Sequence, residues 1–388
     1  MSQRRILTVC SSHRVFGAET ITLRLLQELE RRGHDQLAVT NRWTDGEFSR
    51  RLRDIGVAET VMPFGVLARK LSPQAMWWTF NMMVRVPQLW IAWRRTMRRF
   101  APDIILWTGA RQPLPLLPLL GTVPSFVIEY SNVPPTSGNR WLYEHVGRVC
   151  RGFVAVSDFM RDHLIAVGAP ADRIHVIKSG AFFASDAAST AARFSHRPSN
   201  ALRVGIAGQI ASHKGHDVLV EALRLVRERG VPATVVAFGD GDASYIHHLQ
   251  TAIDEAGLTD AWSWKGYERD KAALYQHMDV CAVPSRFGDP FPTVAMEAGA
   301  YGRPVIAARV GGLPEIVEDG TTGLVCEPDD AASLASAIEW IAHHPDEAAR
   351  MGEAGHRRVF AEFTVERMAD GFERLFARTL VNHEGRFA

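Results

Sequence analysis

Short apolar segments of β-strand type alternate with helical segments along the whole chain, and the alternation occurs twice. The first series of apolar segments is RILTVC, DQLAVT, DIILWT, SFVIEY, GFVAVS and RIHVIK; the second is LRVGIAG, ATVVAFG, AWSWKG, DVCAVPS, PVIAAR and GLVCE. Amphipathic segments such as ETITLRLLQELERRG and HDVLVEALRLVRERG lie between them. This alternation predicts parallel sheets covered by helices. Residues 181–200, rich in Ala and Ser, separate the two series, so we expect a linker between two doubly wound α/β domains.

Length and composition agree with this division. A chain of 388 residues is longer than a single core usually supports. It is 46% apolar and 22% charged with a net charge of +1, so no global charge points to nucleic acid or to an acidic partner. Four cysteines, Cys10, Cys150, Cys281 and Cys326, show no CxxC or zinc spacing, which predicts structural thiols in a reducing compartment. We interpret the N-terminus as a first strand and not as a signal peptide.

Residues 77–100 combine tryptophans and arginines. The apolar part, WWTFNMMVRVPQLWIAW, contains Asn81, Arg85 and Pro87 and makes a poor membrane span. Trp90, Trp93 and Met97 share one helical face, with arginines at 94, 95, 98 and 99 around them. Such a helix either lies on an anionic membrane surface or packs its tryptophans on its own domain, and the sequence favours the second interpretation.

Three loops between a strand and a helix are candidates for ligand binding. In SSHRVFGAET, Gly17 precedes a helix that begins near Ala18, and helix amides attract anions. In GQIASHKGHD, the ammonium group of Lys214 could meet a phosphate near the start of a helix, although a solvated lysine is the simpler interpretation. His213 and His216 lack an evident third metal ligand.

The third loop, FGDGDAS, contains Asp240 and Asp242 in a DxD pattern that can hold a divalent cation on a diphosphate. The same residues also suit a turn between a strand and a helix, with Asp242 as the helix N-cap. We favour the turn.

The stretch GDPFPTVAMEAGAYGRP, residues 288–304, follows the segment DVCAVPS. Pro292 suits the first turn of a helix, which places Glu297 about five residues into that helix and Asp289 before its start. Backbone amides around Phe291, Thr293 and Val294 would lie between the two acids. This layout fits an anion with hydroxyl groups on either side of it, as in a nucleoside diphosphate sugar. Two surface acids near a helix terminus are the equally weighted alternative.

Taken together, these loops resemble those of the retaining glycosyltransferases of family 4, which have the GT-B fold of two facing Rossmann-like domains. The resemblance covers nearly the whole chain and is strongest from Leu202 to Val325. It implies a cleft between an acceptor-binding domain at 1–183 and a nucleotide-sugar domain at 202–363. A hinge-like linker would occupy 184–201, and a last helix within 364–388 would cross back to the first domain.

The resemblance also assigns residues. The family carries two glutamates separated by seven residues, the first on the donor sugar and the second on the ribose, and Asp289 and Glu297 occupy these positions. It implies Lys214 and Asp289 as catalytic. It implies a donor site that contains Gly17, Gln209, Lys214, Gly239, Tyr267, Ser285, Asp289, Phe291, Pro292, Thr293, Val294 and Glu297.

Three positions depart from the family pattern. Asp289 is one methylene shorter than the usual glutamate, and Gln209 replaces a frequent arginine. The strand that often precedes an acceptor-facing histidine here ends in IEYSNVPP, so Glu129, Tyr130, Ser131 or Asn132 could take that role.

The implied activity is transfer of a sugar to an acceptor hydroxyl in cell-surface polysaccharide or glycolipid synthesis. Neither an essential metal nor another cofactor is expected. The acceptor would be a glycan, a lipid-linked sugar or a small molecule, and the location would be the cytoplasm or the inner membrane face. Alternatives are a metal-dependent transferase that uses Asp240 and Asp242, a sugar-nucleotide epimerase of the GT-B fold, and a glycosyltransferase of small natural products. A catalytically silent binding protein is a further alternative.

Overall fold

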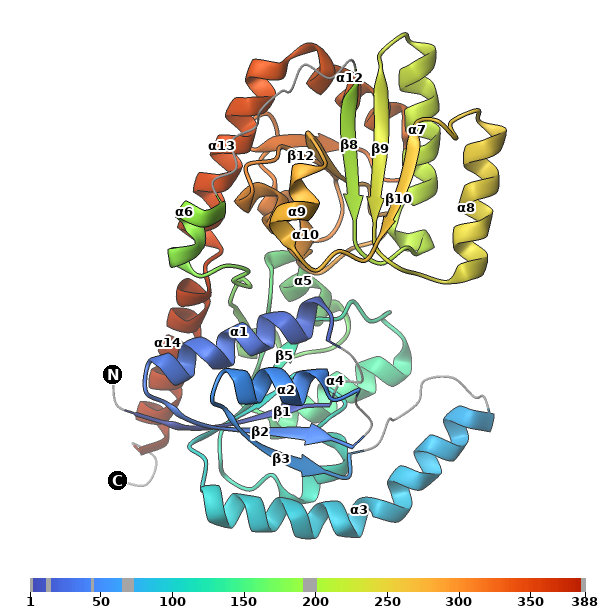
Figure 1. Ribbon diagram of the computed structural model, residues 1–388. Helices are drawn as coiled ribbons and strands as arrows, with labels where there is room; N and C mark the ends of the chain where they lie inside the picture. The colour runs from blue at the N-terminus through green and yellow to red at the C-terminus, as the bar shows by residue number, and fades with distance from the viewer. Residues whose placement is uncertain (1–2, 12–14, 43–44, 65–72, 191–200, 385–388) are drawn as a thin grey trace. The chain divides into compact units, whose positions relative to one another are not determined.

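The chain folds into two compact units, each built on one parallel sheet (Figure 1). The structure, a computed structural model, describes residues 3–11, 15–42, 45–64, 73–190 and 201–384. Unit 1 consists of Met1–Gly180 and Val365–Ala388, and unit 2 consists of Ala181–Thr364. The chain therefore passes between the units twice, and unit 2 is continuous in sequence whereas unit 1 is not.

Unit 1 contains a seven-stranded sheet in the order β3-β2-β1-β4-β5-β6-β7, and every pairing is parallel. Its inner strands are short and buried along their whole length, as is typical of a sheet covered on both faces. The strand bounds are β1 Arg5–Cys10, β2 Asp35–Asn41, β3 Ala58–Met62, β4 Ile104–Trp107, β5 Ser125–Glu129, β6 Gly152–Ala155 and β7 Ile174–Val176.

Helices α1 and α2 cover one side of the unit 1 strands, and α3 lies on the other side (Figure 1). The last helix, α14, packs against α1, although it is about 330 residues away in sequence. The helices of unit 1 are α1 Gly17–Arg31, α2 Glu47–Asp54, α3 Pro73–Phe100, α4 Ser137–Val149, α5 Asp158–Ala166 and α14 Val365–Glu384, with 3₁₀ turns η1 Leu114–Leu119 and η2 Ala171–Arg173.

Helix α3 packs tryptophans on its own unit, the interpretation that the sequence favoured. Trp93 is buried and stacks on Trp107 of β4 with ring centroids 5.5 Å apart. The indole of Trp90 donates to the carbonyl of Pro115 at 2.8 Å. The tryptophan face therefore packs on its own unit, as the sequence favoured. There Trp93 buries its apolar rings, and Trp90 finds an acceptor for its indole N–H.

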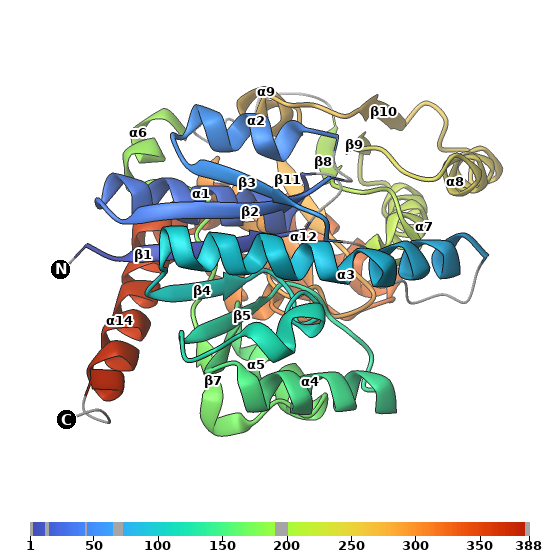
Figure 2. The same ribbon diagram turned by 90° about the horizontal axis from the view of Figure 1, so that it is seen from below.

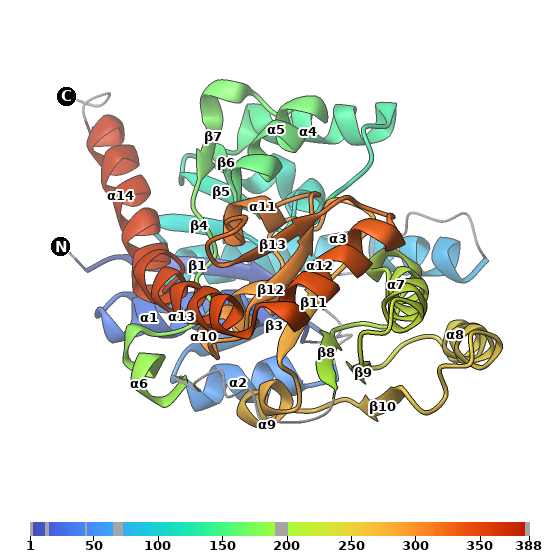
Figure 3. The ribbon, with the colours of Figure 1, turned by 90° about the horizontal axis from the view of Figure 1, so that it is seen from above.

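Unit 2 contains a six-stranded parallel sheet in the order β10-β9-β8-β11-β12-β13. Helices α7 and α12 pack side by side, α7 on β9 and α12 on β12 and β13 (Figure 3). The strands are β8 Leu202–Ala207, β9 Ala233–Phe238, β10 Trp262–Gly266, β11 Val280–Val283, β12 Val305–Ala308 and β13 Gly323–Cys326.

The helices of unit 2 follow the predicted alternation. They are α6 Ala187–Thr190, α7 His216–Glu228, α8 Ala243–Glu255, α9 Lys271–Gln276, α10 Thr293–Ala300, α11 Leu313–Ile316, α12 Ala331–His343 and α13 Pro345–Glu362, with 3₁₀ turns η3 Ala184–Asp186 and η4 Ser212–Lys214. Within the predicted linker 184–201, residues 184–190 form η3 and α6, and residues 191–200 lie outside the described residues.

All twelve predicted strand segments are strands in the structure, and the additional strand β3 was missed. The sequence AETVM of β3 is short, contains a glutamate and lies at the sheet edge, so its apolar pattern is weak. Glu59 in this strand accepts hydrogen bonds from the hydroxyls of Thr40 and Ser49, which stabilise a carboxylate at the edge.

Candidate functional site

The candidate site of unit 2 lies where the order of its strands reverses. Strands β8 and β11 are neighbours in the sheet. After β8 the chain continues to β9 on one side of this pair, and after β11 it continues to β12 on the other side. Ligands of doubly wound sheets bind at the carboxyl ends of strands at such a switch point. The loops 208–215 and 284–292 follow these two strands and contain half of the predicted donor-binding residues.

Lys214 and Asp289 connect the two loops. The ammonium group of Lys214 forms a hydrogen-bonded ion pair with Oδ2 of Asp289, and both side chains are partly exposed. Gly215 follows Lys214 with a φ of +72°, and a Cβ atom there would lie 2.0 Å from the carbonyl oxygen of Pro284. The close approach of the two backbones at Gly215 therefore sets the separation across which the ion pair forms.

The N-terminus of α10 presents unused amide groups beside this ion pair. Pro292 is the N-cap residue, so the helix starts one residue later than the sequence suggested. Phe291 is buried and packs edge-to-face on Phe363 at 5.5 Å, which anchors the loop. The amides of Thr293 and Val294 donate to no acceptor within the described ranges, and both residues are partly exposed. Free amides at a helix N-terminus favour an anion.

Glu297 is the fifth residue of α10, as predicted, and it is fixed by two neighbours. The Tyr275 hydroxyl donates to Oε2 of Glu297 at 3.2 Å, and the ammonium group of Lys271 lies 3.0 Å from the same oxygen. Burial, and then the charge of Glu297, raise the pKa of Tyr275, so its hydroxyl remains a donor. Oε1 of Glu297 has no such partner in the described part of the chain, which leaves it available to a ligand hydroxyl.

The loop after β12 supports the segment that contains Asp289. Gly311 and Gly312 lie directly against residues 288–290, and the amide of Gly312 donates to the carbonyl of Asp289 at 2.9 Å. Gly311 has a φ of +60°, and a Cβ atom there would lie 2.3 Å from the carbonyl oxygen of Asp289. This contact holds Asp289 through its backbone and leaves its side chain to face Lys214.

The other predicted donor residues differ in accessibility. Gln209 is exposed, and Tyr267 is 70% exposed. Gly239 directly follows β9, and its amide donates to the Gly266 carbonyl at 2.8 Å. Ser285 is only 1% exposed and its hydroxyl has no hydrogen-bond partner among the described residues. Of these residues, Gln209 and Tyr267 have side chains that solvent reaches.

The DGD loop forms a helix cap. Asp242 is the N-cap of α8 and accepts hydrogen bonds from the amides of Ser244 and Tyr245, as the favoured interpretation predicted. The hydroxyl and amide bonds of Ser244 and the amide of Tyr245 lower the pKa of Asp242. Asp240 accepts from the amide of Gly241 at 2.8 Å. Within the described residues, no group of three or more His, Cys, Asp or Glu side chains could hold a metal ion.

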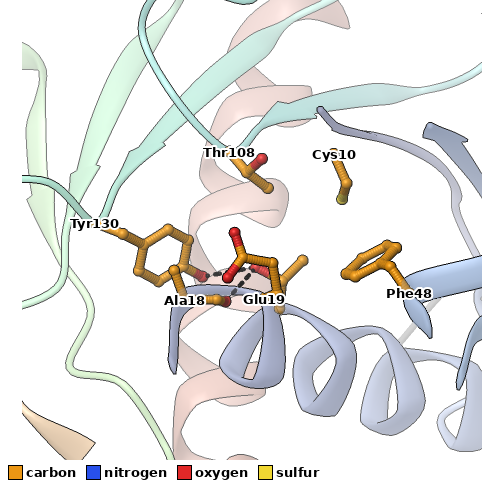
Figure 4. A pocket seen from close by; sticks show the side chains of 7 residues that line it. Cys10, Ala18, Glu19, Phe48, Thr108 and Tyr130 are labelled. Carbon is orange, nitrogen blue, oxygen red and sulfur yellow. Dashed lines mark hydrogen bonds between the residues drawn. The ribbon is translucent and has the colours of Figure 1, made fainter. Parts of the chain in front are cut away.

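A small pocket lies at the corresponding switch point of unit 1, between β1 and β4 (Figure 4). Its volume is about 20 Å³, enough for one water molecule. Figure 4 shows Tyr130 on one side, Cys10 and Phe48 on the other, and Glu19 between them. The complete lining is Cys10, Ala18, Glu19, Thr22, Phe48, Thr108 and Tyr130.

Hydrogen bonds orient the polar side chains that line this pocket, and burial keeps its thiol protonated. Tyr130 and Thr22 share a hydrogen bond of 3.3 Å between their hydroxyl oxygens, and Thr22 also donates to the carbonyl of Ala18 at 2.9 Å. Burial, and then the charge of Glu19, raise the pKa of the Cys10 thiol, so it is neutral and a poor nucleophile. Glu19 accepts from the amide of Phe16 at 2.9 Å, which caps α1 just before Gly17, its first residue.

The four acceptor-side candidates differ in burial and in their position relative to the pocket. Glu129 is buried and accepts from the Tyr143 hydroxyl at 2.7 Å and from the Ser131 amide at 3.1 Å. Burial raises the pKa of Glu129. Tyr130 lines the pocket, whereas Ser131 and Asn132 are exposed beyond it. Of the four, Tyr130 is the one whose side chain enters a pocket.

Sequence reasoning missed Lys271, Tyr275 and the contact made by Gly311. Lys271 and Tyr275 lie in a short helix that begins after the cap Asp270, and nothing in their local pattern points to Glu297. Tyr275 could have been suspected, because a buried tyrosine needs a partner for its hydroxyl. The Gly-Gly pair at 311–312 was the available signal for a close backbone approach.

Two sequence models of families match the chain in succession. The model described as Glycosyltransferase Family 4 matches residues 15–181, and the model described as Glycosyl transferases group 1 matches residues 189–358. Together they span most of both units.

Curated relatives match at moderate identity. The α-D-kanosaminyltransferase of Streptomyces kanamyceticus is 27% identical over 242 residues, which are 60% of this chain and 61% of that protein. A GDP-mannose-dependent α-(1-6)-phosphatidylinositol monomannoside mannosyltransferase of Mycobacterium tuberculosis is 27% identical over 286 residues, 68% of this chain and 73% of that protein. The match to the glycogen synthase of Mycobacterium tuberculosis spans only 39% of that protein.

Solved structures share the fold over nearly the full chain. Anabaena HepE in complex with UDP has a TM-score of 0.79 at 20% identity, over 96% of this chain and 100% of that one. The sucrose-phosphate synthase of Thermosynechococcus elongatus has a TM-score of 0.77 at 20% identity, over 98% and 100%. The fold is therefore GT-B, with two Rossmann-like domains.

Proposed function

The chain belongs to glycosyltransferase family 4, and from this premise we propose that it transfers a sugar from a nucleoside diphosphate sugar to an acceptor hydroxyl with retention of anomeric configuration. The observation that carries the proposal is the Lys214–Asp289 ion pair, which joins the two loops of the switch point beside the free amides of α10. A cation, unused amides and a carboxylate match a diphosphate that bears a sugar.

In this proposal Lys214 and the amides of Thr293 and Val294 bind the diphosphate. Asp289 keeps the ammonium group of Lys214 oriented before the donor arrives, and its carboxylate accepts hydrogen bonds from hydroxyls of the donor sugar. Glu297, oriented by Tyr275 and Lys271, accepts from the ribose hydroxyls. The three anion-binding groups come from elements that the sheet holds in place, so little reorganisation is required on binding.

The reaction breaks the bond between the anomeric carbon and the diphosphate oxygen and forms a bond from that carbon to the acceptor oxygen. Positive charge develops on the sugar and negative charge on the departing diphosphate. Lys214 and the helix amides stabilise the growing negative charge, which is the largest contribution we assign to the protein. The departing phosphate oxygen takes the acceptor proton, so the mechanism requires no protein nucleophile.

The acceptor side is proposed to lie at the pocket of unit 1. Tyr130 replaces the histidine that many family members have, and its hydroxyl orients an acceptor hydroxyl group. A role in cell-surface polysaccharide or glycolipid synthesis is supported by the lipid-linked substrate in the name of the mycobacterial mannosyltransferase. Four free, buried cysteines support a reducing compartment such as the cytoplasm.

Calorimetry with UDP, GDP, ADP and dTDP, each with and without EDTA, tests the donor proposal. We expect one nucleotide to bind equally well in EDTA, because Lys214 and amides replace a cation. Glu297→Ala should weaken that binding about 10- to 100-fold, the range for a lost hydrogen bond to a charged group. An exposed glutamate, Glu255→Ala, is the matched control.

Each result that contradicts the proposal has a defined meaning. Binding that disappears in EDTA and returns with Mn²⁺ would move the site to Asp240 and Asp242. Glu297→Ala with unchanged affinity would remove the ribose role. Interconversion of a donor sugar in the absence of acceptor would replace the transferase with an epimerase, and an inverted product anomer in the proton NMR spectrum would contradict retention.

A further inference from the structure

Helix α3 carries a second face that the fold leaves uncovered. Phe80, Met83, Val84 and Ile91, here called the outer stripe, are between 54% and 64% exposed. Counting about 100° per residue, all four point within about 60° of one direction. Large apolar side chains scattered singly on a surface need no explanation, but four on one helical face do.

The opposite face of the same helix is fixed to unit 1, so the outer stripe cannot turn inward. Leu89 and Trp93 are buried, and Trp93 stacks on Trp107, while Trp90, on the flank between the two faces, donates to the carbonyl of Pro115. Figure 2 shows α3 in front of the sheet, with no labelled element in front of it over most of its length. The outer stripe therefore belongs to the exposed surface of unit 1.

The outer stripe continues into a basic end. Arg94, Arg95 and Arg98 point in the same direction as the stripe, and Arg99 lies beside them; all four are exposed. The 28 residues of α3 include no Asp or Glu. None of these four arginines pairs with an acid within the described part of the chain. An exposed group of four guanidinium groups without an acid partner, next to apolar side chains, is complementary to an anionic, partly apolar surface.

We propose that the outer stripe and basic end of α3 dock unit 1 on an anionic lipid bilayer. The apolar side chains enter the boundary between headgroups and acyl chains, and the arginines contact lipid phosphates. The helix lies on the surface; no helix in the described residues has the length and apolar character for a membrane crossing. A second copy of this chain offers no acid on α3 to pair with the arginines, so the charge pattern favours a bilayer.

This docking face differs from the tryptophan face that the sequence pointed to, and it does not depend on the proposed glycosyltransferase activity. Trp90 and Trp93 hold the helix to its unit, whereas the outer stripe and the arginines are exposed.

Flotation of the full chain with vesicles tests the proposal. The vesicles are phosphatidylcholine alone, or phosphatidylcholine with 30% phosphatidylglycerol, each at 50 mM and 500 mM NaCl. We expect at least tenfold more protein with the anionic vesicles at low salt, and a fall toward the neutral level at high salt. Val84→Ser/Ile91→Ser and Arg94→Gln/Arg95→Gln/Arg98→Gln should each reduce the bound fraction at least tenfold.

Matched controls make the same chemical changes elsewhere on unit 1. Val149→Ser/Ile165→Ser removes two other exposed apolar side chains, and Arg148→Gln/Arg151→Gln/Arg374→Gln removes three other exposed charges. Both controls should float like the wild type, and all variants should retain its circular dichroism and nucleotide affinity.

Three outcomes would overturn the inference: wild-type protein that stays unbound with every vesicle, α3 variants that float as well as the controls, or equal binding to neutral and anionic vesicles. Self-association that is lost in Val84→Ser/Ile91→Ser without vesicle binding would replace the bilayer with a second copy.

Discussion

At the scale of single residues, the Lys214–Asp289 pair shows how the donor loops are prepared for an anion. Each side chain alone would be an ordinary loop residue, and their pairing depends on two strands that are about 75 residues apart in sequence. The carboxylate keeps the ammonium group near the amides of α10, where a diphosphate can share it. The ion pair therefore orients Lys214 for ligand binding. It adds little to the stability of the fold, since partly exposed ion pairs stabilise little.

Lys214→Ala should lower the turnover number about 100-fold or more, because it removes one preorganised group that stabilises the leaving diphosphate. Lys265→Ala, at an exposed lysine within strand β10, should leave turnover within about twofold. Steady-state rates of nucleoside diphosphate release with the donor identified by calorimetry provide the measurement. A Lys214→Ala enzyme at the wild-type rate would refute the role of this lysine.

His216, the first residue of α7, should make the protein sensitive to acid. Burial lowers its pKa from 6.5 to about 4, so the folded chain leaves the ring neutral where the unfolded chain protonates it. The free energy of unfolding should fall as the pH drops from about 6.5 to 4, by about 3 kcal/mol in total. Urea denaturation at several pH values should show a shallower loss for His216→Gln than for the wild type. The exposed His343→Gln should match the wild type.

At the scale of elements, the donor site depends on backbones that touch. The loop after β12 lies against the loop after β11, and the glycine at 311 leaves room for the Asp289 carbonyl. The side chains of the site are positioned by this contact, and the helix N-terminus is positioned by the burial of Phe291.

Gly311→Ala should weaken nucleotide binding at least tenfold, since the new Cβ would displace Asp289 and the start of α10. Gly320→Ala separates this steric effect from backbone strain, because Gly320 also has a positive φ, +72°, but open space around it. We expect Gly320→Ala to bind nucleotide like the wild type while both variants lose stability. Equal affinity in the two variants, measured by calorimetry, would contradict the positioning argument.

Helix α14 is attached to unit 1 by a charge cluster. Arg32 at the end of α1 contacts Asp370 at 2.7 Å and Glu373 at 2.5 Å, and it also contacts the fully buried Glu28 at 2.8 Å. His34 bonds to the other oxygen of Glu373 at 2.9 Å. The cluster adds directional bonds to the packing between α1 and α14, and these bonds fix the rotation of α14.

Arg32→Met should destabilise unit 1 by about 3 kcal/mol, because it leaves buried carboxylates with fewer partners. Arg224→Met is the matched control: its two glutamate partners are on the exposed face of α7, so its loss should lower the free energy of unfolding far less than Arg32→Met does. Native-state hydrogen exchange of α14 amides measures the difference. Unchanged protection in Arg32→Met would show that apolar packing alone holds the helix.

At the scale of the whole molecule, the sequence predicted the architecture better than the site. Strand segments such as LRVGIAG and ATVVAF were recognisable because buried parallel strands are continuous apolar runs. The edge strand AETVM was not, since its pattern is as much polar as apolar. Lys271 and Tyr275 escaped notice because their partner Glu297 is more than 20 residues away and only the fold brings them together. Residue patterns report local structure, whereas a site is assembled from several strand ends.

The attachment of α14 to unit 1 also has a consequence for the order of synthesis. A ribosome completes the 181–364 segment of unit 2 before α14 exists, so unit 1 must wait for a segment made tens of seconds after its first strand, at about 5–20 residues per second. During that interval Arg32 and His34 lack their partners on α14, and the part of α1 that α14 covers is open to solvent or to a chaperone. The nascent chain should therefore acquire protease resistance first in unit 2, and the N-terminal unit should mature only after α14 has emerged from the ribosome.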